Sequence, residues 1–217
     1  MKNRIRFAAI SIITLNMFAN AAGAANPVAG KATALQGNSK GATPCVVCHG
    51  EQGAGNAAAL LPRLAGLDAG YLAKQLRDFQ RDTRKSAVMQ PIAKALSQAE
   101  IADVTAYFAA QRPPASAAAA ADPALLARGA RLATSGFWDK DVPACISCHG
   151  LAGRGVGANF PALAGQHPSY IAQQLNAWRT GTRDNDPQGL MKGIALRLPA
   201  GDIAAVSVYF SSLASEP

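Results

Sequence analysis

Two segments decide the fold of this chain: Cys45-Val46-Val47-Cys48-His49 and Cys145-Ile146-Ser147-Cys148-His149. They contain all 4 cysteines of the 217 residues, and both follow the pattern C-x-x-C-H. An even number of cysteines in an exported chain first suggests disulfide bonds, but this spacing is typical of covalent haem attachment. The two thiols then bind the haem through thioether bonds, and the adjacent histidine is placed under the iron.

The sequence therefore predicts two covalently attached haem c groups. We expect the covalent attachment through Cys45 and Cys48 in one segment and through Cys145 and Cys148 in the other. A thioredoxin-like redox pair also uses C-x-x-C, but it requires a βαβ context that the chain lacks. A zinc site would need the two cysteine pairs close together, and they lie 100 residues apart.

His49 and His149 are the predicted proximal iron ligands, and Met89 and Met191 are the predicted distal ones. These methionines are the only two that follow the first 24 residues, 40 and 42 residues after the histidines. A single methionine is more often part of a core, but one at the same place after each histidine favours ligation. A histidine–methionine pair raises the reduction potential and leaves no open coordination position, which favours electron transfer over catalysis.

Two more pairs of residues occupy matching positions after the C-x-x-C-H segments. The carbonyl oxygens of Pro62 and Pro161 can accept the second ring N–H of the proximal histidines, although ordinary turn prolines are the alternative. Arg84 and Arg183 can pair with haem propionates, and the alternative is that they are exposed surface arginines.

These matches belong to a repeat that covers most of the chain. Leu61–Gly66 matches Phe160–Gly165, and the offset between matching positions stays between 99 and 102 residues. A repeat of this length is a duplicated domain rather than a solenoid unit. We predict cytochrome-like domains at residues 25–112 and 122–217, joined by a linker at 113–121.

The first 24 residues predict a secretory signal peptide. Basic residues precede an apolar stretch that is too short for a membrane-spanning helix, and Ala22-Gly23-Ala24 offers a cleavage site. We expect export to the periplasm and no transmembrane span in the mature chain. Its formal charge is +5, of which residues 25–112 carry +4. This surplus suits an acidic partner and is too scattered for nucleic-acid binding. Lys74, Arg77 and Arg81 form a candidate docking face, and the alternative is that they are an ordinary solvated helix face.

Apolar residues repeat at helical spacing in both halves of the chain. Leu72, Leu76 and Phe79 follow the i, i+4, i+7 pattern, as do their counterparts Ile171, Leu175 and Trp178. No strand alternation is present, so we predict an all-α fold. Domains of this size bury little apolar surface, and a covalently held haem would complete each core.

Taken together, these motifs resemble the cytochrome c4 family, which has two class I cytochrome c domains in tandem. The resemblance covers about residues 27–215 and rests on the paired C-x-x-C-H-G-x-x-G-x-G segments, the P-x-L-A-G motifs and the late methionine of each half. It implies two haem pockets related by a pseudo-twofold axis. Two departures are three extra residues between Arg183 and Met191, and Trp178 in place of Phe79.

The resemblance also implies a function. We expect a periplasmic carrier that transfers single electrons between redox protein partners, from a quinol-oxidising complex to a terminal oxidase, and that has no catalytic activity of its own. The main alternative is an electron-accepting subunit of a periplasmic dehydrogenase, such as a flavocytochrome that oxidises sulfide. A di-haem peroxidase would need an open iron position, which the paired methionines argue against.

Overall fold

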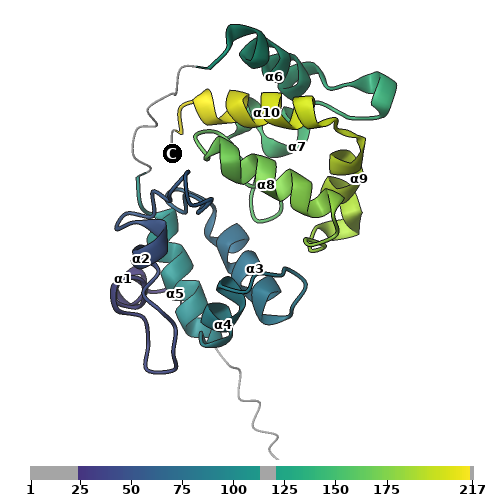
Figure 1. The fold of residues 1–217 in the computed structure, drawn as a ribbon. Helices are drawn as coiled ribbons and strands as arrows, with labels where there is room; N and C mark the ends of the chain where they lie inside the picture. The colour runs from purple at the N-terminus through teal and green to yellow at the C-terminus, as the bar shows by residue number, and fades with distance from the viewer. Residues whose placement is uncertain (1–23, 113–120, 216–217) are drawn as a thin grey trace, which may run out of the picture.

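A computed structural model describes residues 24–112 and 121–215, which we call the first half and the second half. In these ranges the chain forms helices, and its β-structure is limited to isolated bridges, which confirms the all-α prediction. Figure 1 shows each half as a separate group of helices. The predicted signal peptide, apart from residue 24, and the predicted linker, apart from residue 121, lie outside the described residues.

The first half consists of five helices in which α1 packs against α5, while α3 packs against α4 and α5. Figure 1 shows α5 running through the middle of this group. The helices are α1 (Pro27–Gln36), α2 (Val46–His49), α3 (Ala69–Gln80), α4 (Met89–Lys94) and α5 (Gln98–Ala109).

The second half repeats this arrangement, with α6 against α10 and α8 against α9 and α10. Its α-helices are α6 (Pro123–Ser135), α7 (Ile146–His149), α8 (Pro168–Arg179), α9 (Leu190–Arg197) and α10 (Ala200–Ser212). Three short 3-10 helices lie between them: η1 (Trp138–Lys140), η2 (Leu151–Gly153) and η3 (Pro187–Gly189).

Matching side chains fill the cores of the two halves. In the first half, Leu72 of α3 and Phe108 of α5 are buried. Their counterparts in the second half, Ile171 of α8 and Phe210 of α10, are buried in the same way. The start of α5 is fixed by its own sequence. The hydroxyl of Ser97 accepts from the backbone N–H of Glu100, in a complete capping box. The predicted helical periodicity therefore corresponds to the buried faces.

Within the described residues, no single helix is both long and apolar enough to cross a membrane. The pair Pro187–Arg197 and Ala200–Ser212, bent by 113°, meets the length and composition criteria only when its two parts are taken together.

A glycine allows the N-terminal helix of each half to approach the last helix closely. A Cβ atom added at Gly30 would lie 2.0 Å from the carbonyl oxygen of Asp103, and one at Gly129 would lie 2.2 Å from that of Ala205. These distances are far below van der Waals contact. The α1–α5 and α6–α10 pairs therefore depend on glycine at these positions.

We predict that Gly30→Ala destabilises the folded chain by about 1–3 kcal/mol, because the added methyl group must push α1 away from α5. Glycine-to-alanine changes inside helices normally stabilise by up to about 1 kcal/mol, so the expected sign is reversed. Gly201→Ala in α10 is the matched control, since no atom lies within 4 Å of its added Cβ. Denaturant unfolding measures both variants, and equal effects would contradict the close approach.

Candidate haem sites

Each C-x-x-C-H segment forms a single helical turn. Cys45 precedes α2, and the backbone N–H of His49 donates to the carbonyl of Cys45 at 2.9 Å. The second half repeats this bond between His149 and Cys145, also at 2.9 Å. Residues three and four positions apart share one face of a helix, so the two cysteines and the histidine of each segment lie on the same side. Within the described residues none of the four cysteines forms a disulfide bond, so all four sulfur atoms are available for thioether bonds to haem.

The two predicted proximal histidines are buried and oriented by proline carbonyls. His49 is 7% exposed and donates from Nδ1 to the carbonyl oxygen of Pro62 at 3.0 Å, while His149 is 6% exposed and donates to Pro161 at 2.8 Å. Burial lowers the pKa of both imidazoles, against the opposing effect of these hydrogen bonds. A neutral ring with its Nδ1 occupied has its Nε2 available for iron.

A glycine-rich loop follows each histidine and packs against the core. The backbone N–H of Gly55 donates to the carbonyl of His49 at 2.7 Å, and a Cβ added at Gly53 would lie 2.7 Å from the ring of Phe108. Gly53 also has a φ of 73°, in the region that favours glycine. A Cβ added at Gly153 would likewise lie 2.7 Å from the ring of Phe210. Both loops therefore need glycine to pass close to the core.

The two predicted distal ligands begin helices rather than lying within loops. Met89 is the first residue of α4 and Met191 is the second residue of α9, and both are partly buried. The three extra residues of the second half are accommodated by η3, in which Gln188 has a φ of 58°. The segments that lead to the two methionines therefore differ in shape. Iron ligation by these methionines stays a prediction.

Arg84 and Arg183 are buried, at 8% and 5% exposure, which excludes the alternative of exposed surface arginines. The Arg84 guanidinium lies 4.7 Å from the ring centroid of Phe79, and that of Arg183 lies 4.1 Å from that of Trp178. Both distances are within cation–π range. The Phe79-to-Trp178 difference between the halves thus lies directly under these two arginines.

Both arginines also hold the two halves together. Arg84 donates to the hydroxyl of Tyr170 and to the side-chain carbonyl of Gln174, each at 2.8 Å, and Arg183 donates to Gln75 at 3.1 Å. An isolated antiparallel bridge joins the backbones of the two arginines. The predicted pairing of these guanidinium groups with propionates stays a prediction.

The charges at this contact fit the anionic edge of a haem. Lys74 pairs with Asp78 at 2.5 Å, and this carboxylate also accepts from Asn185 at 2.7 Å. Arg84 and Arg183 add two buried cations next to this pair. Among the described residues of the contact, positive charge is therefore in excess, as expected where propionates bind.

Lys74, a member of the predicted docking face, also contacts the second half. Its ammonium group pairs with Asp78 along α3 and donates to the carbonyl of Asn185, across the contact, at 2.7 Å. Its side chain is 27% exposed, so docking through Lys74, Arg77 and Arg81 stays a prediction, but the ammonium group of Lys74 is already engaged on both sides of the contact. The sequence near Lys74 does not reveal this contact, because Asn185 lies 111 residues away along the chain.

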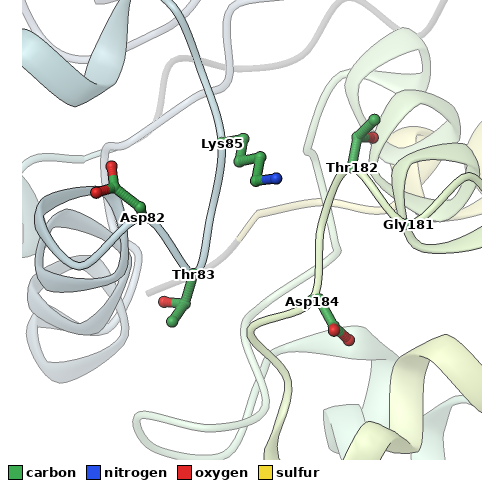
Figure 2. A pocket seen from close by; sticks show the side chains of 6 residues that line it. All are labelled: Asp82, Thr83, Lys85, Gly181, Thr182 and Asp184. Atoms are coloured by element: carbon green, nitrogen blue, oxygen red, sulfur yellow. The ribbon is translucent and has the colours of Figure 1, made fainter.

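A polar pocket of about 250 Å³ lies beside the arginine bridge. Figure 2 shows the residues that line it, from matching loops of the two halves. They are Asp82, Thr83, Lys85, Gly181, Thr182 and Asp184. Asp82 pairs with Lys94 at 2.9 Å and Asp184 with Lys192 at 3.1 Å, so each carboxylate is neutralised within its own half.

Sequence reasoning missed a contact between Arg63 and Gln166. The backbone N–H of Arg63 donates to the Gln166 side-chain oxygen, and the Gln166 amide donates to the Arg63 carbonyl, both at 2.9 Å. The available signal is a mismatch inside the shared P-x-L-A-G motif, where Ala162 replaces Arg63. A contact between residues 103 positions apart leaves no local pattern that a single sequence reveals.

Comparison with known proteins gives close matches along the chain. The family model of cytochrome c matches residues 35–111 and again residues 126–214. A protein of Stutzerimonas stutzeri (strain A1501), named thiosulfate dehydrogenase electron acceptor, is 49% identical over 177 residues, 82% of each chain. Its namesake in Thiomonas intermedia (strain K12) is 46% identical over 176 residues, 81% of this chain and 80% of the relative. Cytochrome c4 of Thiocapsa roseopersicina is 42% identical over 180 residues, which are 82% of this chain and 91% of the relative.

Two solved structures have the same fold. Thiosulfate dehydrogenase TsdBA from Marichromatium purpuratum aligns with a TM-score of 0.81 at 42% identity over 87% of this chain. The present chain spans 40% of the length of that protein. Reduced recombinant cytochrome c4 from Pseudomonas stutzeri aligns with a TM-score of 0.78 at 35% identity, over 88% of this chain and 100% of that one.

We predict that the mature chain carries two haem groups, because the helical turn that presents two thiols and a histidine is present twice. Mass spectrometry of the denatured protein measures this directly, and it should find two haem additions on a chain that begins near Ala25. Finding one haem, or a free thiol at any of the four cysteines, would contradict the assignment.

Replacing Met89 by alanine should open one iron to added ligands and lower that haem's potential, because the thioether is lost. Met191→Ala should do the same to the other haem, so each variant is the control for its partner. Absorbance and carbon monoxide binding report the change. If Met89→Ala leaves both haems low-spin and closed to carbon monoxide, another residue is the ligand.

Proposed function

The chain belongs to the cytochrome c family, in its di-haem cytochrome c4 branch, and from this premise we propose that it accepts electrons from a periplasmic thiosulfate dehydrogenase. It carries two covalently bound haem c groups and transfers electrons. The sequence left open that the chain is the electron-accepting subunit of a periplasmic dehydrogenase. Our proposal adopts that alternative, with thiosulfate instead of sulfide as the substrate of the partner enzyme.

Similarity to two electron acceptors carries this proposal. The two relatives named for thiosulfate dehydrogenase are 49% and 46% identical to the chain, above the 42% of the Thiocapsa roseopersicina cytochrome c4. The TsdBA structure supports it further, because 87% of the chain aligns with part of a thiosulfate dehydrogenase. We infer export to the periplasm from the predicted signal peptide.

Each half of the chain contributes a fixed environment for one electron-accepting centre. Bound haem supplies an iron that changes between Fe(II) and Fe(III). His49 and His149 are fixed by proline carbonyls, at 3.0 and 2.8 Å, so the ligand geometry can stay constant while the charge changes. The contact between the halves holds the two centres in one unit. Forming a sulfur–sulfur bond from two sulfur anions is a two-electron oxidation, and two one-electron centres can take both electrons.

The second candidate is a carrier between a quinol-oxidising complex and a terminal oxidase. It is favoured by the cytochrome c4 structure from Pseudomonas stutzeri, of which 100% is covered by this chain. Both candidates use the same haem sites, and they differ in the protein that delivers the electrons.

The test is to mix the oxidised chain with the thiosulfate dehydrogenase of its own bacterium and to start the reaction with thiosulfate. Stopped-flow absorbance should then show reduction of both haems, at a rate that rises with enzyme concentration. Thiosulfate without enzyme, and enzyme without thiosulfate, are the controls.

The competing carrier is tested in the same apparatus with host membranes and a quinol. If the membranes reduce the chain rapidly while the dehydrogenase with thiosulfate does not, the proposal is wrong and the second candidate is favoured. Faster reduction by the dehydrogenase supports the proposal.

A further inference from the structure

Arg63 is a buried cation in the first half, and its charge is balanced by no carboxylate among the described residues. Its side chain donates to the carbonyl of Ala65 in its own half and to that of Ala164 in the other half, the latter at 2.9 Å. The residue is 3% exposed, and its Nε has no hydrogen-bond partner in the part of the chain that the structure describes. Backbone carbonyls orient the guanidinium but do not cancel its charge.

The guanidinium remains charged under physiological conditions. Burial lowers the pKa of Arg63 to about 10, which is still well above neutral pH. Water screens an exposed cation strongly, whereas a buried one acts on its surroundings through a lower effective dielectric constant.

The residue that carries this charge directly follows the proline that orients His49, the predicted ligand of the first haem. The carbonyl oxygen of Pro62 accepts from Nδ1 of His49 at 3.0 Å, and the N–H of the same peptide unit belongs to Arg63. That N–H donates to Gln166 of the second half at 2.9 Å. The contact between the halves thus fixes the peptide that holds His49.

The second half has no equivalent of this arrangement. Ala162 takes the place of Arg63, and Leu67 takes the place of Gln166. The other buried charges at the contact add little difference between the halves, because Arg84 and Arg183 are matched and Asp78 is paired with Lys74. Arg63 is therefore the one buried charge of this contact, within the described residues, that is neither matched nor paired.

We propose that Arg63 raises the reduction potential of the haem held by His49 and so biases an electron within the chain towards the first half. A nearby positive charge stabilises the reduced centre, which carries one positive charge less than the oxidised one. The second half has Ala162 at the matching position and meets this guanidinium at the carbonyl of Ala164, so we expect a smaller effect on the second haem. The inference concerns the chain's own residues and holds for either proposed electron donor.

The test is a redox titration of the whole chain followed by NMR, with the haem methyl signals assigned to each half. In Arg63→Gln the electron affinity of the first haem should fall about tenfold, the usual size of a neighbouring charge effect, which is about 59 mV for one electron. The second haem should shift much less. Arg63→Lys, which keeps the charge, should restore most of the lost potential.

Three further variants separate charge from structure. Lys31→Gln removes the same charge from an exposed position of the first half and should leave the first haem almost unchanged. Gln166→Leu removes the two hydrogen bonds between Gln166 and the backbone of Arg63 but keeps the Arg63 charge and its bond to Ala164, so it should cause a smaller shift than Arg63→Gln. Arg63→Ala introduces the residue of the matching position and replaces Arg63→Gln if that variant does not fold.

Two results would overturn the proposal. If Arg63→Gln, or Arg63→Ala in its place, shifts both haems equally or neither of them, the charge does not act selectively on the first half. If Gln166→Leu causes the full shift with Arg63 still charged, the potential depends on how the peptide is positioned and not on the charge.

Discussion

The hydrogen bond from each buried histidine to a proline carbonyl is the interaction on which the rest of its half depends. It links the C-x-x-C-H turn to a segment 13 residues later in the first half and 12 later in the second, which forces the intervening chain into a tight loop. Gly53 lets the first loop pack against Phe108, and Gly153 lets the second pack against Phe210. A Cβ added at either glycine would lie 2.7 Å from the ring. The same bond fixes the orientation of the imidazole, so the loop, the core and the predicted iron ligand are set by one contact.

Duplication of this unit gives two sites with the same local construction but different surroundings. Each half brings one buried arginine, stacked on an aromatic ring, to the contact between the halves. Arg63 and Gln166 then break the symmetry, because neither has a counterpart in the other half. Two centres in one chain can therefore share their ligands and still differ in their affinity for an electron. Such a difference gives an electron carrier a direction.

Much of this could be predicted from the sequence, because short-range rules govern it. The haem turns, the helices and the proline acceptors follow from motif spacing and from the agreement between two copies. The contact between the halves could not be predicted in this way. Lys74 looks like an ordinary helix-surface cation in the sequence, yet its ammonium group also bonds to the carbonyl of Asn185 in the second half. The burial of Arg63 likewise depends on Ala164 and Gln166, about 100 residues away, and no local pattern records such packing.

The central claim is that one folded chain holds two one-electron centres in unequal environments. A potentiometric titration of the unmodified protein, followed through its haem absorbance, tests this claim most directly. The account predicts two one-electron steps per chain at separate potentials. A single one-electron step would contradict the presence of two centres, and two steps at the same potential would contradict their inequality.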